Sequence, residues 1–580
     1  MKVPQSVRSL RTYDGRVFLS DAIAGITVGL VALPLAMAFA IASGMPPQAG
    51  IYCAIVAGFL TSAFGGSLTA IGGPTGAFVV VVAGIIGQYG VNGLFLCTIM
   101  AGIILVALGA TGVGSAVKYI PRPVVIGFTN GIAVLIASTQ LRDFFGLRIE
   151  QMPDEFIERM RAVIESFHTI SPEATALGIV TVLTVVATPR VTRRAPGTVV
   201  AMLGVTIGAV LLGLQVETIG TRFGGVPSGL PRLQWPAVQW TMLPDLLVPA
   251  MTVAMLGAIE SLLSATVADR MMGSRHEPNV ELVGQGIANI VSPLVGGLPA
   301  TGAIARTATN IRSGAKTPVA GMIHAVTLLM ILLFAAPLAA QIPLAVLAGL
   351  LFIVAYNMGE WHEIPSLLKL TKADIAVWLA TFALTVVADL TVAVEVGMVL
   401  AALLFIRRVS ETTSVARVTD TLIEDGRQHS LQGLTIPDYL AVYRIHGPFL
   451  FGTTDKLNSI IDTLETLPPI VIVRLRHVPA MDASGLQALE DVADQIHASG
   501  RTLLLCGARE QPAHVMKRAE FHAHVGDANI LPHVQAALER AAQIAKELGL
   551  GEATDAKRTA PLKSRPAPDL HVERDDAMMR

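Results

Sequence analysis

Charged residues are scarce in this 580-residue chain, at 15%, and aromatic residues are scarcer still, at 5%. Soluble domains average roughly 25% charged residues, so this deficit and a mean hydropathy of +0.61 exclude an ordinary soluble enzyme. A net charge of only -1 argues against nucleic acid as a partner, because binding phosphates needs a basic excess. Three cysteines are too few for a disulfide framework, and we expect Cys53, Cys97 and Cys506 to be packing residues.

No nucleophile paired with a base, no Gly-rich nucleotide loop with Lys and no cluster of metal-ligand residues stands out in the sequence. We therefore predict that the protein is not an enzyme and needs no cofactor or metal.

What the chain has instead is long apolar runs, which extend from Leu19 to Ile406 and stop at Arg407. We predict a short N-terminal segment at residues 1–18 and a membrane domain at residues 19–408. A connector at 409–436 leads to a soluble domain at 437–548. The tail at 549–580 is rich in Ala, Pro and mixed charge, without an apolar face, and is predicted to be disordered. The N-terminus does not resemble a signal peptide.

Fourteen apolar segments are candidates for transmembrane helices, each of which needs about 20 residues to span a bilayer. They are 19–42, 50–65, 75–89, 92–113, 121–141, 172–188, 196–216, 244–268, 279–294, 301–313, 317–339, 343–358, 373–388 and 390–407. Segments 75–89 and 301–313 are too short to cross alone. Short segments that follow Gly and Pro are typical of the discontinuous helices of transporters.

Basic residues fall on one side of the membrane if the number of spans is even, and by the positive-inside rule that side is cytoplasmic. They form the clusters Lys2/Arg8/Arg11/Arg16, Lys118/Arg122, Arg190/Arg193/Arg194, Arg270/Arg275, Arg312/Lys316, Lys369/Lys372 and Arg407/Arg408. The opposite side has uncharged loops and one acid-rich loop at 142–171, with Glu150, Asp154, Glu155, Glu158 and Glu165. Both termini are therefore predicted to be cytoplasmic.

The membrane domain contains two internal echoes at nearly one offset. The stretch from Gly72 to Ala77 resembles that from Gly296 to Ala303, and the stretch from Ile120 to Gly127 resembles that from Ile342 to Gly349. The offsets are 226 and 222 residues. Seven spans per half would make this an inverted repeat, which is common in secondary transporters.

Both copies of the first echo lead through Gly and Pro into Thr-Gly-Ala and a short helix. The first N–H groups of a helix have no intrahelical partner and carry the positive end of its dipole. Two such ends near the membrane midplane predict an anion site without a formal charge. The residues that would form it are Thr75, Gly76, Ala77, Thr301, Gly302 and Ala303. The alternative is that both threonines only cap helices.

Ionisable residues inside a membrane are costly and usually functional. Glu260 lies in the middle of segment 244–268, with Ser264 one helical turn further on. It is a candidate to bind a cation or exchange a proton; the alternative is a structural carboxylate between helices. Arg306 either adds positive potential to the anion site or only sets topology. Three other ionisable residues lie in or near the apolar segments. We expect Asp389 in an exposed turn and His324 packed in the interior, and we expect Glu395, inside the last segment, to pair with a group on another helix.

These motifs resemble the SulP anion permeases, the sulfate permease or solute carrier 26 family, from about residue 15 to about residue 545. The resemblance rests on the stretch from Leu33 to Tyr52, with Leu35 where many members have a polar residue. It rests also on the stretch from Pro299 to Thr307 and the loop from Ser313 to Pro318. It implies fourteen segments in two inverted halves, divided into a core and a gate domain. It also implies an anion between the third and tenth segments, with Phe39, Phe78 and Arg306 among its contacts.

The family resemblance extends to the coupling ion and the assembly. Members known for sodium-coupled bicarbonate uptake carry Asp at the position of Glu260, and Glu there resembles the proton-coupled bacterial members. The eighth segment would face the anion with Glu260 and Ser264. Members commonly form homodimers, and we expect this chain to be a multi-pass protein of the cell inner membrane.

Beyond Arg408 strands and helices alternate, which is typical of an open sheet with helices packed on it. We predict strands at 440–446, 470–475 and 502–506, and helices at 453–467, 484–499, 511–520 and 531–548. The stretches from Phe449 to Gly452 and from Met481 to Leu486 resemble a STAS domain. In the related anti-sigma-factor antagonists the serine that matches Ser484 is phosphorylated, which implies a switch and a cytoplasmic protein partner. The alternative is that Asp482 or Ser484 merely caps a helix.

Taken together, the sequence predicts a secondary active transporter of sulfate, bicarbonate or dicarboxylate, coupled to protons and working by alternating access. The alternatives are a sodium-coupled bicarbonate symporter, an uncoupled anion conduit, and a membrane-tethered signalling protein whose output is the STAS domain.

Overall fold

The computed structural model describes residues 3–9, 13–112, 121–149, 152–153, 155–192, 196–227, 229–237, 240–388, 390–418, 436–461 and 464–550. The chain forms two compact units, Met1–Ala401 and Ala402–Arg580. Several sequence predictions fall outside the described residues: those for Lys2, Arg11, Lys118, Glu150, Asp154, Arg193, Arg194, Asp389, the side chain of Glu395, most of the connector and the tail from 551 to 580.

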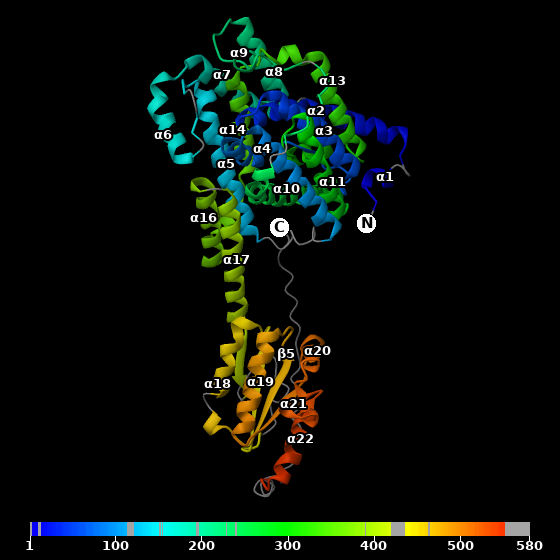
Figure 1. The fold of residues 1–580 in the computed structure, drawn as a ribbon, viewed down its shortest axis with the longest axis vertical. Helices are drawn as coiled ribbons and strands as arrows, with labels where there is room; N and C mark the ends of the chain where they lie inside the picture. Colours follow the sequence, from blue (N-terminus) through cyan, green and yellow to red (C-terminus); the bar gives the residue numbers. More distant parts are fainter. Residues whose placement is uncertain are drawn as a thin grey trace, which may run out of the picture. The chain divides into compact units, whose positions relative to one another are not determined.

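The first unit is helical (Figure 1). Its helices are α1 (Gln5–Ser9), α2 (Gly15–Ala42), α3 (Pro47–Phe64), α4 (Ala77–Ala110), α5 (Arg122–Phe145), α6 (Phe156–Ser166), α7 (Pro172–Val191), α8 (Gly197–Leu211), α9 (Ile219–Phe223), α10 (Leu243–Met272), α11 (Pro278–Val291), α12 (Ile304–Arg312), α13 (Val319–Ala339), α14 (Leu344–Met358), α15 (Ile364–Leu367), α16 (Lys372–Val387) and α17 (Leu390–Thr412), which continues into the second unit. Two short strands, β1 (Gly72–Gly73) and β2 (Thr301–Gly302), interrupt the helices.

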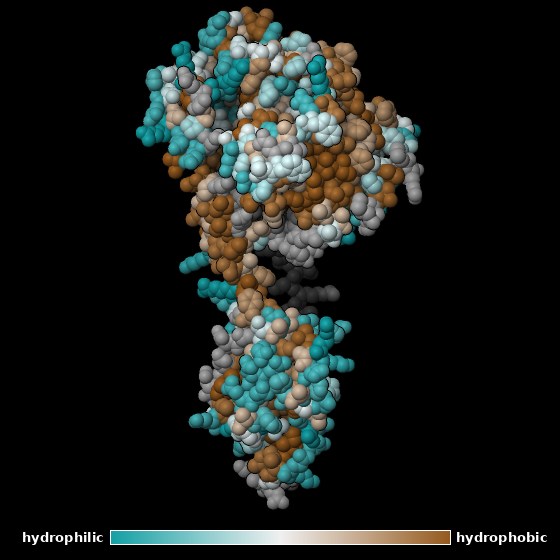
Figure 2. Space-filling view, in the orientation of Figure 1, coloured by the Kyte–Doolittle hydropathy of each residue, from teal (hydrophilic) through white to brown (hydrophobic). Residues whose placement is uncertain are grey.

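Each of the fourteen predicted segments contains a helix. Within the described part of the chain, eight helices are long and apolar enough to cross a membrane by themselves, and α8 is a shorter apolar helix. Exposed apolar side chains lie along the outer helices, for example Ile23 and Ile26 of α2 and Phe334 of α13. Figure 2 shows a broad hydrophobic area on this unit. The number of membrane crossings stays a prediction at fourteen.

Helix packing in the first unit occurs in matched pairs. The contact of α2 with α13 corresponds to that of α10 with α4. In the same way, the contact of α3 with α13 corresponds to that of α11 with α4, and the contact of α5 with α16 corresponds to that of α14 with α7. Two halves related by a two-fold axis require such matched contacts. Close approach at the α4–α11 contact depends on glycine: a Cβ on Gly102 or Gly286 would lie 2.7 or 2.6 Å from the carbonyl oxygen of the other. Small residues at such contacts are characteristic of membrane helix pairs.

Three local features of this unit differ from the sequence prediction. The helices expected to begin at residues 75 and 301 begin at Ala77 and Ile304. Antiparallel pairing of Gly72–Gly73 with Thr301–Gly302 keeps the backbone that leads into each helix extended. Segments 75–89 and 92–113 are joined in α4, with a break at Gly90, where φ is 70° and ψ is 178°. The acid-rich loop contains a helix, α6.

The second unit is a five-stranded sheet with helices on both faces. Its strands are β3 (Ser414–Arg417), β4 (Leu440–His446), β5 (Ile470–His477), β6 (Thr502–Cys506) and β7 (Ile530–Leu531), in the order β3-β4-β5-β6-β7. Strands β4 to β7 are parallel and β3 is antiparallel to β4. The helices are α18 (Asn458–Ile461), α19 (Ala483–Ala498), α20 (Glu510–Arg518), α21 (His522–Val525) and α22 (Val534–Glu547).

Alternation along the strands creates two cores, because successive side chains point to opposite faces of a sheet. Ala441 and Tyr443 of β4 pack in one core with side chains of α19. Leu440 and Val442 pack in the other core with side chains of α22. The α/β prediction for this unit is confirmed. The three cysteines are buried, as expected.

Residues 453–467 are not the continuous α-helix that their sequence predicts. They form a 3-10 turn (Phe451–Leu457), the short α18 and a second 3-10 turn (Leu464–Thr466), with 462 and 463 outside the described residues. The hydroxyl of Thr453 donates to the carbonyl oxygen of Leu450 at 2.7 Å and accepts from its N–H at 2.9 Å. Such side-chain bonds to the local backbone compete with α-helix formation.

Candidate functional site

The candidate site is built around the two strands that interrupt the helical unit. Strands β1 and β2 pair antiparallel, with Gly72 opposite Gly302 and Gly73 opposite Thr301. Each strand leads into a helix, β1 into α4 and β2 into α12. A Cβ on Gly72 would lie 2.2 Å from the Thr61 hydroxyl oxygen, so only glycine fits there. The echo seen in the sequence is therefore a physical crossing of two extended segments.

Polar side chains of α12 satisfy the backbone of the first extended segment. The N–H of Ile71 donates to Thr307 Oγ1 at 3.0 Å, and Asn310 Nδ2 donates to the carbonyl oxygen of Thr69 at 2.9 Å. Arg306 Nη2 donates to the carbonyl oxygen of Pro74. Non-helical backbone is tolerated inside a membrane only where it is buried in protein or lines a cavity. These bonds explain how residues 69–74 remain extended.

The second extended segment is held by α11. Asn289 donates to the carbonyl oxygen of Ala300 at 2.9 Å and accepts from its N–H at 2.8 Å. Gln285 Nε2 donates to the same oxygen at 2.5 Å, and the hydroxyl of Ser292 donates to the carbonyl oxygen of Leu298 at 2.7 Å. The two segments are therefore fixed from different helices.

Helix α10 packs directly on the crossing. The Thr301 hydroxyl donates to the carbonyl oxygen of Gly257 at 3.0 Å and lies 2.9 Å from the Ser261 hydroxyl. Ser261 Oγ also accepts from the N–H of Gly302 at 3.1 Å. The hydroxyls of Ser264 and Thr307 lie 2.9 Å apart. All six residues in these contacts are buried. Their hydrogen bonds tie α10 to β2 and to α12.

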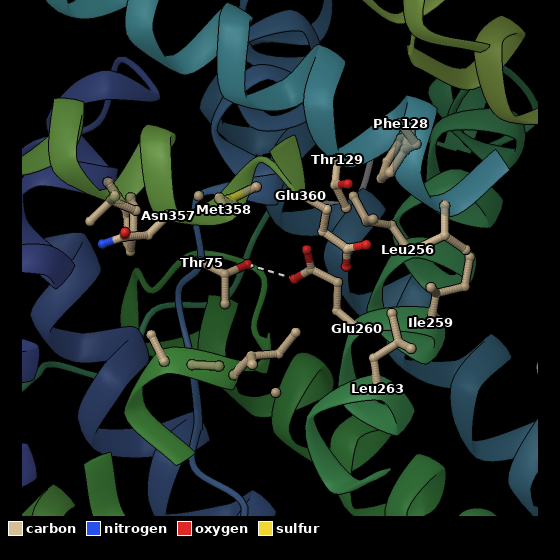
Figure 3. A pocket seen from close by; sticks show the side chains of 18 of the residues that line it. Thr75, Phe128, Thr129, Leu256, Ile259, Glu260, Leu263, Asn357, Met358 and Glu360 are labelled. Atoms are coloured by element: carbon tan, nitrogen blue, oxygen red, sulfur yellow. Dashed lines mark hydrogen bonds between the residues drawn. The ribbon is translucent and has the colours of Figure 1, made fainter. Parts of the chain in front are cut away.

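A cavity of about 530 Å³ opens between this crossing and the α5–α14 helices. Its walls come from α2, the two residues before α4, and α5, α10, α12 and α14, and they are mostly apolar. Among the residues that line it are Leu35, Phe39, Thr75, Gly76, Phe128, Thr129, Glu260, Gly302, Ala303, Arg306, Asn357 and Glu360. Several of these side chains are drawn in Figure 3.

Two opposite charges face this cavity from α10 and α12. Glu260 Oε2 accepts a hydrogen bond from the Thr75 hydroxyl at 3.0 Å (Figure 3). Arg306 is only 2% exposed, and its Nη1 has no hydrogen-bond partner among the described residues. The cavity therefore combines a carboxylate, a guanidinium and the N-terminal ends of α4 and α12. Such an arrangement can bind a small anion and respond to a proton.

Most of the residues predicted for the site come together in this cavity. Those that line it are Phe39, Thr75, Gly76, Glu260, Gly302, Ala303 and Arg306. Those that lie behind its wall are Ala77, Phe78, Thr301 and Ser264, all buried. Phe78 lies against α10, with its ring 3.7 Å from the Cβ position of Gly257. Leu35, where many members of the resembled family have a polar residue, also lines the cavity.

Sequence reasoning missed other residues of the cavity and its supports. Thr129, Asn357 and Glu360 line it, and Asn289 and Gln285 hold its second extended segment. Glu360 lies two residues beyond the predicted span 343–358, where an acidic residue usually faces water, so the sequence offers no reason to select it. Nothing in the chain's pattern marks Asn289 as a partner of Ala300, since the contact depends on the crossing.

The buried carboxylate of Asp21 holds the loop at residues 313–318, which is one of the stretches that carry the family resemblance. Its Oδ1 accepts from the backbone N–H groups of Lys316 at 2.7 Å and Thr317 at 3.2 Å. Its Oδ2 accepts from the Thr317 hydroxyl at 2.5 Å. This loop is a structural clamp between α2 and α13, outside the cavity.

In the second unit Asp482 is the N-cap of α19, and its Oδ1 accepts from the N–H of Gly485 at 2.8 Å. Ser484 lies one residue inside the helix and is exposed. Capping is therefore assigned to Asp482, and Ser484 is left free of that role.

Comparison with known proteins assigns both units to the families that the sequence resembles. The sulfate permease family matches residues 18–381, and the STAS domain matches residues 434–537. YvdB of Bacillus subtilis (strain 168), named as a candidate sulfate transporter, is 40% identical over 523 residues, covering 90% of this chain and 97% of YvdB. The bicarbonate transporter BicA of Synechocystis sp. is 32% identical over 526 residues, covering 88% of this chain and 92% of BicA.

Two solved structures are similar. The transmembrane domain of a cyanobacterial BicA superposes with a TM-score of 0.60 at 34% identity, covering 67% of this chain and 98% of that one. The murine anion transporter Slc26a9 superposes with a TM-score of 0.81 at 16% identity, covering 93% of this chain and 94% of that one, and so shares the fold. With the family match over most of the helical unit, the conclusion is that this chain belongs to the sulfate permease family of membrane anion transporters and carries a C-terminal STAS domain.

Proposed function

We propose that the protein is a secondary active transporter that carries a small anion together with protons, with Glu260 as the coupling group. The observation that carries this proposal is the position of the Glu260 carboxylate. It lies in the same cavity as Arg306 and the extended segments that precede α4 and α12.

The anion would lie between the N-terminal ends of α4 and α12. Unpaired N–H groups at a helix start attract anions, and Gly76 and Gly302 allow a ligand to approach the backbone. Arg306 adds a full positive charge whose Nη1 is unpartnered within the described residues. Thr75 adds a hydroxyl. Ala77, Phe78, Thr301 and Ser264 would support these groups from behind rather than bind the anion directly.

Coupling follows from electrostatics. Two like charges about 5 Å apart repel by about 3 kcal/mol at an effective dielectric constant of about 20. An ionised Glu260 therefore opposes an anion in the cavity, and a proton on Glu260 removes that repulsion. Because linkage is reciprocal, the anion in turn favours the protonated carboxyl.

The proposed substrate class is sulfate, bicarbonate or a dicarboxylate. A bicarbonate transporter and a candidate sulfate transporter are among the relatives. Transport would proceed by movement of α2, α4, α10 and α12 against α5 and α14, since the cavity lies between these groups.

The remaining assignments are proposals of the same kind. We propose the cell inner membrane as the location, with both termini cytoplasmic by the positive-inside rule, and a homodimer as the assembly. Ser484, exposed at the start of α19, is the proposed phosphorylation site of the STAS domain, where a cytoplasmic protein partner would read it.

The test is radiolabelled uptake into proteoliposomes with sulfate, bicarbonate, fumarate and succinate, under an inward proton gradient and separately under an inward sodium gradient. We expect accumulation driven by protons alone, lost in Glu260→Gln. Asp245→Asn is the matched control, because Asp245 is exposed in the first turn of the same helix and outside the cavity lining. Equilibration without accumulation under both gradients would contradict coupling.

A sodium-coupled bicarbonate symporter is the second candidate, and similarity to BicA favours it. Accumulation of bicarbonate driven by sodium alone would establish that candidate in place of proton coupling.

A further inference from the structure

A second carboxylate, Glu360, lines the transport cavity. It lies between α14 and the 3-10 turn Trp361–Glu363, and it is partly buried. Glu260 lies in α10 and Glu360 follows α14, and Figure 3 shows both carboxylates directed into the cavity. The role proposed above for Glu260 leaves Glu360 unexplained.

The two basic side chains near Glu360 contact another acidic residue, Glu363. Arg122, at the start of α5, forms an ion pair with Glu363 at 2.6 Å. His362 Nε2 lies 3.7 Å from the same Glu363 carboxylate. In the part of the chain that the structure describes, the Glu360 carboxylate has no hydrogen bond or ion pair. A partly buried carboxylate in a mostly apolar wall is costly when it is ionised and unpaired.

The charge balance of the cavity gives Glu360 a role. The charged and titratable groups around Glu360 are of two kinds. Glu260 of α10 and Arg306 of α12 line the same cavity, and Arg122, His362 and Glu363 lie near the end of α14. With both cavity carboxylates ionised, Glu260, Glu360 and Arg306 sum to one negative charge, which repels any anion. With both protonated, they sum to one positive charge. Each bound proton therefore removes one unit of repulsion.

We propose that Glu360 is a second proton-binding group of the cavity and that the substrate is a divalent anion, which crosses with two protons, one on Glu260 and one on Glu360. This inference rests on the proposed proton-coupled function. On binding, each carboxylate takes one proton from water to become a carboxylic acid, and on release each returns it to the opposite side. A monovalent anion needs only one such proton to offset its charge.

The experiment measures the number of protons carried per anion. Initial rates of radiolabelled sulfate and fumarate uptake into proteoliposomes are compared with simultaneous proton uptake reported by an internal pH-sensitive dye. The wild-type protein should give a ratio of two and Glu360→Gln a ratio of one. Glu363→Gln is the matched control, since Glu363 lies three residues away outside the cavity lining, and it should keep the ratio of two. Glu360→Asp retains a carboxyl group and should also keep it.

Each other outcome rejects either this inference or the function beneath it. No proton-driven accumulation of any anion by the wild-type protein rejects the proposed function. A wild-type ratio of one, or a ratio of two that Glu360→Gln leaves unchanged, rejects the role of Glu360 while proton coupling stands. Proton-driven accumulation of bicarbonate without sulfate or fumarate rejects the divalent substrate. If Glu360→Gln does not fold, a wild-type ratio of one still rejects the inference, and Glu360→Ala, which also removes the carboxyl group, takes the place of Glu360→Gln in the test.

Discussion

Gly302 has no space for a side chain at the point where β2 meets α10. A Cβ there would lie 2.9 Å from both Ser261 Cα and Ser264 Cβ, and the first of these is backbone. Its N–H is also bound to Ser261 Oγ. Any larger residue must push the extended segment away from α10 and out of the wall of the cavity.

We therefore expect Gly302→Ala to destabilise the protein by about 1–3 kcal/mol, the usual cost of overpacking a tight site, and to abolish uptake. Thermal unfolding in detergent measures the first effect. Gly204→Ala in α8 is the control, because its added Cβ meets nothing within 4 Å. An unchanged melting temperature for Gly302→Ala would show that the crossing is looser than described.

Thr75 provides a second test at the residue scale, since its hydroxyl donates to Glu260 at 3.0 Å. A hydrogen bond to a charged group contributes about 1.5–3 kcal/mol. Thr75→Val, which keeps the shape and removes the donor, should lower uptake at least tenfold. Thr75→Ser should retain most of it. Equal uptake by Thr75→Val and the wild-type protein would remove Thr75 from the site.

Individual residues were predictable from the sequence to different degrees. Glu260 stood out because a carboxylate in the middle of an apolar span has few alternatives. Arg306 could be read as a site residue or as a topology signal, and the structure places it in the cavity wall. Glu360 was not found, since an acidic residue just beyond a span usually faces water.

At the scale of elements, α11 keeps the second extended segment in place. Asn289 makes two hydrogen bonds to Ala300 and is 1% exposed. Asn289→Ala leaves both backbone groups of Ala300 with fewer partners, at about 1–3 kcal/mol for each group left unsatisfied. We expect a lower melting temperature and slower uptake. Asn279 lies at the start of the same helix, and its Oδ1 has no hydrogen-bond partner among the residues that the structure describes, so Asn279→Ala should cost less stability. The reverse order of the two variants would contradict this role.

In the second unit, α21 is tied to α19 by a pH-sensitive contact. His524 Nδ1 lies 2.7 Å from Asp494 Oδ1, and this hydrogen bond is the main reason why the pKa of His524 is raised above its ordinary value. A raised folded-state pKa contributes stability that is full below the ordinary histidine pKa of about 6.5. That stability is lost as the pH rises through the folded pKa.

Asp494→Asn should therefore lower the stability of the full-length protein at pH 5.5 and leave it unchanged at pH 9. Both groups are partly exposed, so the difference should be about 0.2–1 kcal/mol. Melting temperatures of the two proteins across this pH range measure it. A gap that stays constant with pH would assign the effect of the substitution to something other than the charged pair.

Helices and strands were predictable wherever apolar periodicity alone decides them. The fourteen apolar segments all contain helices, and β4, β5 and β6 lie where alternation places them. The exceptions depend on distant partners. Helix α12 begins at Ile304 because Thr301 and Gly302 pair with residues far away in the chain. The 3-10 turn at 451–457 follows from hydrogen bonds of Thr453.

For the whole molecule, every residue that lines the cavity lies within the first unit, Met1–Ala401. A chain that ends after α17, at Thr412, should therefore still transport the anion. Uptake per folded molecule, measured in proteoliposomes, is expected to stay within about threefold of the full chain. Complete loss of uptake from a folded truncated protein would show that the STAS domain takes part in the transport cycle.

The coupling of anion and proton movement is tested most directly by running the transporter in reverse. Proteoliposomes loaded with sulfate, and without any pH gradient at the start, are diluted into sulfate-free buffer while an internal dye reports pH. If Glu260 couples the two, outward sulfate movement carries protons with it and the lumen becomes alkaline. Glu260→Gln should release sulfate with about half of this alkalinisation per sulfate, because only the proton on Glu360 then accompanies the anion. Sulfate efflux from the wild-type protein with no change in internal pH would contradict proton coupling.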